Sequence, residues 1–275
     1  MLLTMLLLFF VSIPQDSLLI ETEFEEVATN LSRASAVDVT PSGELFIVET
    51  GRNRLLILNQ RGLRQDSLGA RGTGDYRFDR PLDIDVTNGM RLYVADSRNQ
   101  SVKMYDRRLR FLGMLTPTAS TGAFSRFQPE MVSVNILGEA FVYDADSRSI
   151  LRFSEQGNVS ASIDLQMFDI EFPIRHMRVR DEVIYLIDQR GNVLHQLTTG
   201  GNYLGFTMMP HSAHRLAITE TAVWAAGTQA IQKMNHRGRV VQEFKNPTNQ
   251  TPTGIAIKPG TILLLTERTL FRADF

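Results

Sequence analysis

The hydrophobic residues of this chain fall into short runs that alternate with polar positions, and the same arrangement recurs along most of the sequence. Each copy holds a short alternating strand, a turn with Gly or a polar pair, and a strongly apolar strand that ends at an acidic or polar residue. Alternation with a period of two is typical of half-buried β-strands. The six copies begin at Ala36, Pro81, Pro129, Pro173, Ala213 and Pro252. The pattern therefore predicts an all-β protein built from repeats.

The period of the repeats indicates their architecture. The ends of the predicted first strands align at Val39, Val86, Val134, Val179, Ile218 and Ile257, and subtraction gives steps of 47, 48, 45, 39 and 39 residues. Blades of β-propellers repeat at about 40 to 50 residues, and long amphipathic helical stretches, which would indicate βαβ units, are absent from the sequence. We predict a single six-bladed β-propeller of four-stranded blades over residues 17–275.

The two ends of the propeller are expected to share one blade. The sixth copy supplies about three strands before Phe275, whereas Leu18–Phe24 (LLIETEF) has the pattern of a strand without a blade of its own. An unpaired sheet edge invites aggregation, and closing the ring removes that edge. We predict that residues 17–26 form the outer strand of the last blade.

Residues 1–16 contain an apolar run, Met1–Ile13, that precedes the predicted propeller. The run is too short to cross a bilayer as a helix, which takes about 20 residues. It is typical of the hydrophobic region of a secretory signal, although the segment before it has no Lys or Arg and no clean cleavage site follows. We predict a signal peptide or N-terminal anchor, an exported protein in the periplasm or outside the cell, and membrane association only through this segment.

Composition and charge exclude several classes of partner and site. The chain has 29 basic and 30 acidic residues, a formal net charge of -1, and 43% hydrophobic residues. Nucleic-acid-binding surfaces are usually strongly basic, so we expect no nucleic-acid partner. The chain has no Cys, which excludes disulfides, thiolate metal ligands and a Cys nucleophile.

One repeat carries a recognisable family motif. The segment Leu92–Tyr105 (LYVADSRNQSVKMY) is an apolar strand that ends in Asp-Ser-x-Asn, and it follows Pro81, the apolar inner strand with Ile84–Val86, and Gly89 at the turn. It resembles the NHL repeat. Copies one to four match recognisably, with the acidic position filled by Glu49, Asp96, Asp146 and Asp188. Copies five and six depart from the motif, with Gly227 and the pair Thr266-Glu267 at that place.

The resemblance specifies the fold more closely than the function. NHL propellers are mostly binding scaffolds, a minority are metal-dependent lyases, and related six-bladed propellers include lactonases. The repeated acidic residue has a structural explanation as well, because Asp commonly accepts backbone N–H groups in a following turn.

Strand direction sorts the loops into two faces. The loops that enter each blade and the loops after the acidic position share one face, which we call the loop face. Loops held by a rigid scaffold usually carry recognition. Five loops after the acidic position present an arginine, namely Arg52, Arg98, Arg148, Arg190 and Arg268. We predict that this ring binds a small anionic ligand or an acidic protein segment, although each arginine could instead pair with a carboxylate of its own or a neighbouring blade.

A second group of charged residues is expected around the central channel. The loops entering the blades place Asp83, Glu130, His176, His214 and Arg215 at the channel mouth. One step inward, Asp38, Asp85 and Arg178 occupy inner-strand positions that copies five and six fill with Ala217 and Ala256. Charges there would be costly in a dry core, so a hydrated channel is implied. The set either forms salt bridges along the channel or, with its two His, binds a divalent metal ion.

The sequence favours binding over catalysis. We see no Ser/His/Asp arrangement, and neither His195 nor His236 has an evident partner. The first hypothesis is a non-enzymatic, exported propeller that binds a protein or small anionic ligand on its loop face, without a cofactor. The alternative is a metal-dependent lyase or lactonase acting at the channel mouth.

Overall fold

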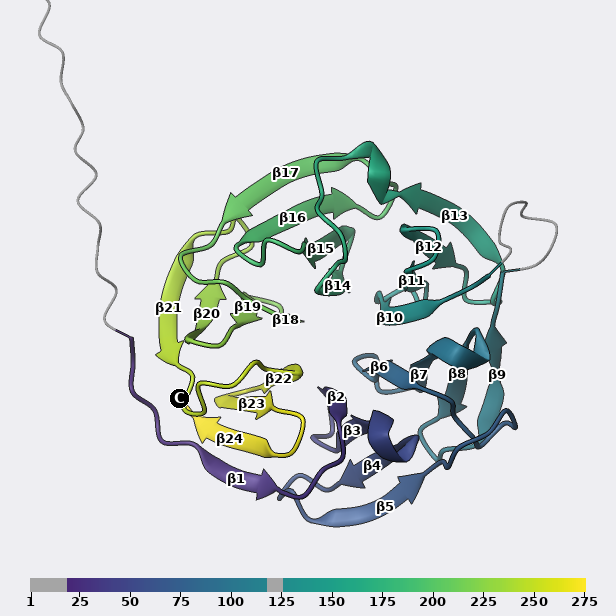
Figure 1. The fold of residues 1–275 in the computed structure, drawn as a ribbon, viewed down its shortest axis with the longest axis horizontal. Helices are drawn as coiled ribbons and strands as arrows, with labels where there is room; N and C mark the ends of the chain where they lie inside the picture. The colour runs from purple at the N-terminus through teal and green to yellow at the C-terminus, as the bar shows by residue number, and fades with distance from the viewer. Residues whose placement is uncertain (1–18, 118–125) are drawn as a thin grey trace, which may run out of the picture.

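The computed structural model describes residues 19–117 and 126–275, and these residues form six four-stranded antiparallel sheets. The sheets stand in a ring around a central axis as the blades of a propeller, so the predicted fold class is confirmed (Figure 1). In each blade the first strand lies innermost and the fourth outermost.

The first three blades follow the chain in order. Blade 1 consists of β2 (Ala34–Val39), β3 (Leu45–Glu49), β4 (Arg54–Leu58) and β5 (Arg64–Leu68). Blade 2 consists of β6 (Pro81–Asp85), β7 (Arg91–Asp96), β8 (Ser101–Asp106) and β9 (Phe111–Leu115). Blade 3 consists of β10 (Pro129–Val134), β11 (Ala140–Asp144), β12 (Ser149–Phe153) and β13 (Val159–Asp164). Short 3₁₀ turns lie in the connecting loops at η1 (Thr50–Arg52), η2 (Ser97–Asn99) and η4 (Leu165–Met167).

The last three blades complete the ring. Blade 4 consists of β14 (His176–Arg180), β15 (Val183–Ile187), β16 (Val193–Thr198) and β17 (Tyr203–Met208). Blade 5 consists of β18 (Arg215–Ile218), β19 (Val223–Ala226), β20 (Ala230–Met234) and β21 (Val240–Lys245). Blade 6 consists of β22 (Gly254–Lys258), β23 (Thr261–Leu265), β24 (Leu270–Asp274) and, from the other end of the chain, β1 (Glu25–Ala28).

The N-terminal strand closes the ring, a few residues later than the sequence pattern indicates. β1 pairs antiparallel with β24, with Glu25 opposite Arg272 and Ala28 opposite Leu270. Only the end of the predicted segment 17–26 belongs to this strand. Ahead of it, Ile20 forms a parallel bridge to Phe244 of blade 5. The segment therefore joins two blades, which the sequence pattern did not indicate.

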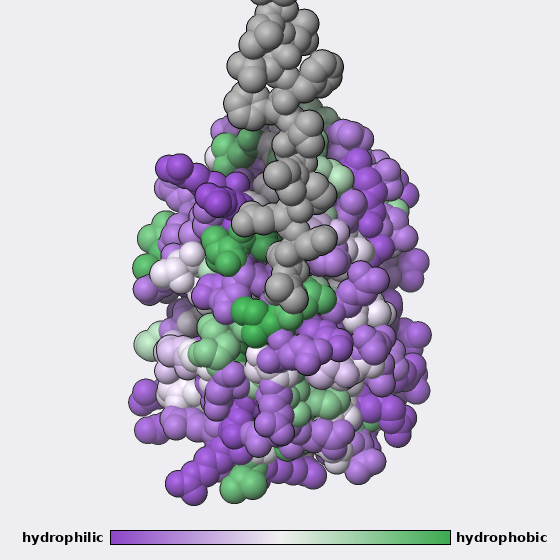
Figure 2. Space-filling view, turned by 90° about the vertical axis from the view of Figure 1, so that its left-hand side faces the viewer, coloured by the Kyte–Doolittle hydropathy of each residue, from purple (hydrophilic) through white to green (hydrophobic). Residues whose placement is uncertain are grey.

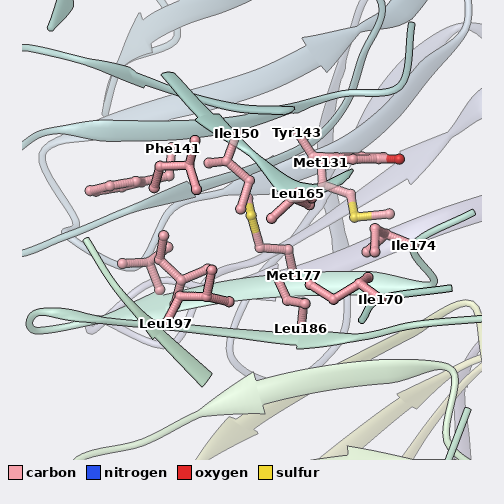
Figure 3. Close-up of a cluster of buried hydrophobic side chains, with 13 residues drawn as sticks. Met131, Phe141, Tyr143, Ile150, Leu165, Ile170, Ile174, Met177, Leu186 and Leu197 are labelled. Atoms are coloured by element: carbon pink, nitrogen blue, oxygen red, sulfur yellow. The ribbon is translucent and has the colours of Figure 1, made fainter. Parts of the chain in front are cut away.

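The hydrophobic core lies between the blades. The described residues contain six clusters of buried apolar side chains, and each cluster combines two neighbouring blades. Between blades 3 and 4, for example, Phe141 and Ile150 face Met177 and Leu186 (Figure 3). Because strands alternate their side chains between two faces, each sheet contributes to two clusters. The blades thus depend on their neighbours on both sides.

The outer wall beside β21 and β24 is mainly hydrophilic, with small separate hydrophobic groups (Figure 2). Val241, which is 56% exposed, is one of the apolar residues on β21. Isolated exposed apolar residues of this kind are normal on soluble surfaces. No helix within the described part of the chain is long and apolar enough to cross a membrane. The predicted signal or anchor segment 1–16 lies outside the described residues.

The closing strand offers a direct test of ring closure. Val27 and Ala28 pack against the core cluster between blades 6 and 1. A chain that begins at residue 29 lacks β1 and leaves the edge of β24 unpaired. A chain that begins at residue 24 keeps β1 and its pairing with β24. We expect the shorter chain to melt roughly 5 to 10 °C below the longer one, which corresponds to a loss of a few kcal/mol for a domain of this size. Equal melting temperatures in calorimetry would contradict closure by β1.

Candidate functional site

The acidic residue at the end of the second strand ties down the loop that enters the same blade. Ser32 donates its N–H to Glu49 (3.0 Å), and Asp79 donates to Asp96 (2.8 Å). The same bond runs from Gln128 to Asp144 (2.8 Å) and from Glu171 to Asp188 (3.2 Å). The incoming loop, 16 or 17 residues earlier in the chain, is thus a consistent donor to this carboxylate. The acidic residue therefore has the structural role that the sequence predicted, but the prediction named only the following turn as the donor and missed the incoming loop.

The motif alignment chose the wrong residue in blade 3. Asp146, predicted at the acidic position, is exposed, whereas Asp144 ends β11 and is buried. Asp144 lies opposite Ser149, as Asp96 lies opposite Ser101. Strand pairing therefore fixes Asp144 as the equivalent, and the similarity of Asp146-Ser147 to Asp96-Ser97 is misleading.

The five predicted arginines all lie on loops between second and third strands, on the loop face and outside the inner strands. Arg52 pairs with Glu49, Arg98 lies 3.6 Å from Asp79, and Arg190 lies 2.6 Å from Asp188. Arg148 stacks over the ring of Phe172 at 5.1 Å, and Arg268 is exposed. Three of the five therefore already have a carboxylate partner. Binding of an anionic ligand by this ring stays a prediction.

Both histidines for which the sequence suggested no partner have one. His195 is buried in β16, with Nε2 3.2 Å from Asp188 and Nδ1 2.8 Å from the hydroxyl of Tyr203. His236 contacts the hydroxyl of Tyr185 at 3.1 Å. These partners come from hairpin pairing and from a neighbouring blade, so local sequence could not indicate them.

A belt of side chains links the inner strands of neighbouring blades. The belt position is the inner-strand residue before each aligned Val or Ile, and it holds Asp38, Asp85, Ser133, Arg178, Ala217 and Ala256. The N–H of Val86 donates to Asp38 (2.8 Å), that of Val134 to Asp85 (2.9 Å), and that of Val179 to the Ser133 hydroxyl (2.9 Å). Each inner strand is a sheet edge with unpaired N–H groups. Side chains of the preceding blade satisfy these groups.

Asp83 and His176, two of the predicted channel residues, also accept an N–H of the next blade. Each lies two positions before the belt residue of its strand. Val132 donates its N–H to Asp83 (3.0 Å), and Leu216 donates to Nδ1 of His176 (3.0 Å). Burial, together with Arg178 and Arg215, holds the pKa of His176 well below its usual value. A neutral imidazole is the form that can accept this bond at Nδ1. His176 therefore serves as an inter-blade acceptor.

One ion pair crosses the channel. Arg178 of blade 4 donates from both terminal nitrogens to the two oxygens of Asp83 in blade 2, at 2.8 and 3.0 Å. Burial lowers the pKa of Arg178, but Asp83, Asp38 and Asp85 outweigh that effect and raise it. Such a forked pair is the strongest form of charge-assisted hydrogen bond. The inner-strand charges thus gather around one guanidinium.

The remaining channel residues lie towards the loop face. Arg215 donates to the carbonyls of Thr253 (2.7 Å) and Arg175 (3.1 Å), and burial lowers its pKa to about 10. His214 contacts Arg175, and burial lowers the pKa of His214 to about 4. Glu130 lies 3.7 Å from Arg80. Asp83, His176 and Arg215 share the surroundings of Arg178, whereas Glu130 pairs elsewhere.

A well-formed cavity opens on the opposite face, among the loops that join first and second strands. We call this the hairpin face. The cavity has a volume of about 550 Å³, within the range of roughly 300 to 1,000 Å³ typical of small-molecule sites. Apolar lining comes from Val39, Met90, Val134, Ile136, Leu137, Val179, Ala217, Ile218, Ile255, Ala256 and Ile257. Polar lining includes Asp38, Asn88, Arg91, Ser133, Glu155, Arg178, Arg180 and Asp181.

The belt explains why the cavity lies where it does. Blades 5 and 6 place only the methyl groups of Ala217 and Ala256 at the belt position, so less of the channel is filled beside them. At the rim, Met90, Ile136 and Leu137 are 71%, 83% and 69% exposed. Sequence reasoning noted the alanines but missed the cavity. Tight hairpin turns usually hold polar residues, so the apolar residues in these turns were the sequence signal that could have indicated the cavity.

Asp38 lies at the floor of the cavity. Its oxygens accept the N–H groups of Val39 and Val86, both at 2.8 Å, and the Thr87 hydroxyl lies 3.4 Å away. Burial and the neighbouring Asp85 raise the pKa of Asp38 to about 7, against the opposing effect of Arg178. Burial raises the pKa of Asp85 as well. A carboxyl group that titrates near neutral pH in a cavity is a candidate functional group.

The geometry of the fold matches that of known six-bladed propellers. No protein-family model and no curated protein sequence matches the chain. A solved structure described as a putative gluconolactonase aligns with a TM-score of 0.69 and 14% identity, covering 92% of this chain and 92% of that chain. A streptogramin B lyase aligns at 0.67 and 13%, covering 92% and 97%. A virginiamycin B lyase from Staphylococcus aureus aligns at 0.66 and 12%, covering 92% and 99%. At these identities the likeness shows the fold alone.

The pair between Arg178 and Asp83 predicts a large loss of stability. Arg178→Met leaves the buried Asp83 and Asp85 and the half-buried Asp38 without their cation, so we expect the free energy of unfolding to fall by about 3 to 5 kcal/mol. Arg98→Met, which removes an exposed arginine 3.6 Å from Asp79, should cost at most about 1 kcal/mol. Urea unfolding followed by fluorescence measures both. A loss below 1 kcal/mol for Arg178→Met would show that the channel is fully solvated.

The raised pKa of Asp38 predicts a pH-dependent effect of its replacement. The protonated form of Asp38 is favoured in the folded state, so its contribution is present below the ordinary carboxyl pKa and disappears as pH rises through about 7. Asp38→Asn removes this dependence. We expect the stability of the variant, relative to the parent chain, to increase between pH 4 and pH 8 in parallel denaturation series. A difference that stays constant with pH would refute the raised pKa.

Proposed function

We propose that this chain is a non-enzymatic binding propeller that takes a small amphipathic molecule into the cavity of the hairpin face. The cavity itself carries the proposal. It combines a small-molecule volume with apolar walls and convergent polar groups, and small-molecule sites use both. Exposed Met90, Ile136 and Leu137 extend the apolar surface to the rim.

The family resemblance supports binding as the activity. The NHL-like copies imply a scaffold of the kind that mostly binds other molecules, and the short apolar N-terminal run supports an exported, periplasmic or extracellular protein. A rigid ring of blades is suited to such a role, because it holds the loops around the channel in fixed positions.

The cavity is a better candidate than the arginine ring on the loop face. Arg52, Arg98 and Arg190 already have carboxylate partners. A ligand there would have to replace existing ion pairs at an exposed surface, where each pair contributes little. The cavity offers burial of apolar surface in addition to polar contacts, which is the larger driving force.

A lyase or lactonase is the second candidate, with its site in the cavity of the hairpin face instead of at the predicted channel mouth. The cavity-facing carboxyl group of Asp38 favours it, because general acids and bases work best with a pKa near the operating pH. A divalent metal ion does not fit the channel residues. Among the described residues, no group of three or more His, Cys, Asp or Glu side chains is arranged to hold one metal ion, and His176 Nδ1 accepts the N–H of Leu216. We therefore derive no metal-dependent step.

A neutral apolar probe tests binding in the cavity. We expect N-phenyl-1-naphthylamine to bind with one-to-one stoichiometry and an increase in fluorescence. Ala217→Phe fills the wall of the cavity and should weaken binding at least tenfold. Ser162→Phe adds the same ring at an exposed position on the outer strand β13 and should leave binding unchanged.

Far-UV circular dichroism and thermal melting verify that both variants keep the fold. Absence of probe binding to the parent chain, or equal affinity for the parent and a folded Ala217→Phe variant, would contradict a ligand site in this cavity.

A further inference from the structure

The charges at the rim of the cavity are already matched to one another. Arg91 lies 3.4 Å from Glu155. Arg180 lies 3.8 Å from Asp181 and 3.6 Å from Glu220. The rim therefore presents paired charges, and ligand selection by charge has to come from the floor.

At the floor of the cavity, the guanidinium of Arg178 already has a carboxylate partner, whereas no cation in the described part of the chain contacts the carboxyl group of Asp38. The terminal nitrogens of Arg178 donate to both oxygens of Asp83 and to the carbonyls of Val132 and Met177. Asp38 accepts only backbone N–H groups and a distant hydroxyl. Among the described residues that line the cavity, Asp38 is the carboxylate without a contacting cation. A ligand can supply that cation.

The belt does not require a carboxylate at this place. Ser133 accepts the N–H of the next blade with a neutral hydroxyl. Asp85 also carries a carboxyl group, but it is only 2% exposed and accepts from Val134, Thr87 and Ser133. Asp38 is the one of the two carboxylates that lines the cavity. The two carboxyl groups and Arg178 are the charged groups that act on one another here.

We propose that the ligand carries a protonated amine, and that its ammonium group forms an ion pair with Asp38 while its apolar body lies against Ala217, Ile255 and Ile257. This inference rests on the proposed function, because it assigns the head group of a molecule bound in the same cavity. The ammonium donates N–H groups to Asp38 at the floor of the cavity and adds a positive charge beside Asp38 and Arg178, with Asp83 and Asp85 buried behind them.

Binding has a consequence for protons. The fraction of Asp38 that is protonated at neutral pH must ionise to pair with the ammonium, and its proton passes to solvent. The amine is already protonated when it binds and gives up no proton. The only proton released is therefore the one that leaves each Asp38 that ionises. Proton release on binding therefore accompanies the ion pair and is absent for a neutral ligand.

Three probes with the same apolar chain separate the head groups: octylamine, 1-octanol and octanoate. Each competes with N-phenyl-1-naphthylamine for the cavity at pH 7. We expect octylamine to bind at least tenfold more tightly than 1-octanol, and octanoate to bind most weakly. Calorimetry in buffers of different ionisation enthalpy should show proton release with octylamine and none with 1-octanol.

Two variants locate the effect. Asp38→Asn keeps an oxygen acceptor for Val86 and should abolish the preference for octylamine while binding of 1-octanol persists. Asp66→Asn removes an exposed carboxylate from the outer strand β5, away from the cavity, and should keep the preference. Binding of all three probes with equal affinity, or tightest binding of octanoate, would overturn the amine inference while leaving the cavity as a ligand site.

Two further outcomes would also overturn the inference. A preference for octylamine that survives Asp38→Asn would place the ammonium elsewhere. Thermal stabilisation by Ca²⁺ alone, lost in Asp38→Asn, would assign the floor to a metal ion. Failure of every probe, the naphthylamine included, would instead remove the proposed function.

Discussion

In every blade of this propeller, the innermost strand has backbone N–H groups that find no partner within their own sheet. The innermost strand pairs on one side only, so its outward N–H groups face the channel, where an unsatisfied donor costs about 1 to 3 kcal/mol. In blades 2 to 5, side chains from the preceding blade accept these N–H groups, through Asp38, Asp83, Asp85, Ser133 and His176. The hydrophobic clusters between blades hold the sheets together, but these bonds set the relative height of neighbouring inner strands.

The choice of acceptors determines the chemistry of the channel. Three of them are aspartates, and their charges accumulate around the guanidinium of Arg178, which donates to both oxygens of Asp83. Blades 5 and 6 have alanine at the belt position, so the belt is incomplete there and the cavity opens beside Ala217 and Ala256. One incomplete belt thus explains an apolar wall and an incompletely neutralised carboxyl group in the same cavity. Both features are needed for the proposed amphipathic ligand.

The sequence predicted the periodic features of the molecule and missed those that depend on pairing between distant segments. Alternation and period indicated six blades, and alignment placed Asp38, Asp85 and Arg178 in the channel. The assignment of Asp146 to the acidic position was wrong because it followed the letters of the motif. Strand register, in which Asp144 lies opposite Ser149, identifies Asp144 instead. The closing strand begins later than expected because pairing with β24, and not local hydrophobicity, fixes its bounds. The cavity arises from the absence of side-chain volume in two blades, which no motif records.

The titration of Asp38 tests this account most directly, because the belt bond to Val86, the floor of the cavity and the amine inference all involve this half-buried carboxyl group, which no cation within residues 19–117 and 126–275 contacts. Carbon-detected NMR of ¹³C-labelled aspartate, assigned with the Asp38→Asn variant, measures it. The account predicts a midpoint near pH 7 in the free protein, and a lower midpoint when Asp85 is replaced by Asn. A midpoint near 4, the ordinary value for Asp, would show that Asp38 is fully solvated and would contradict the account.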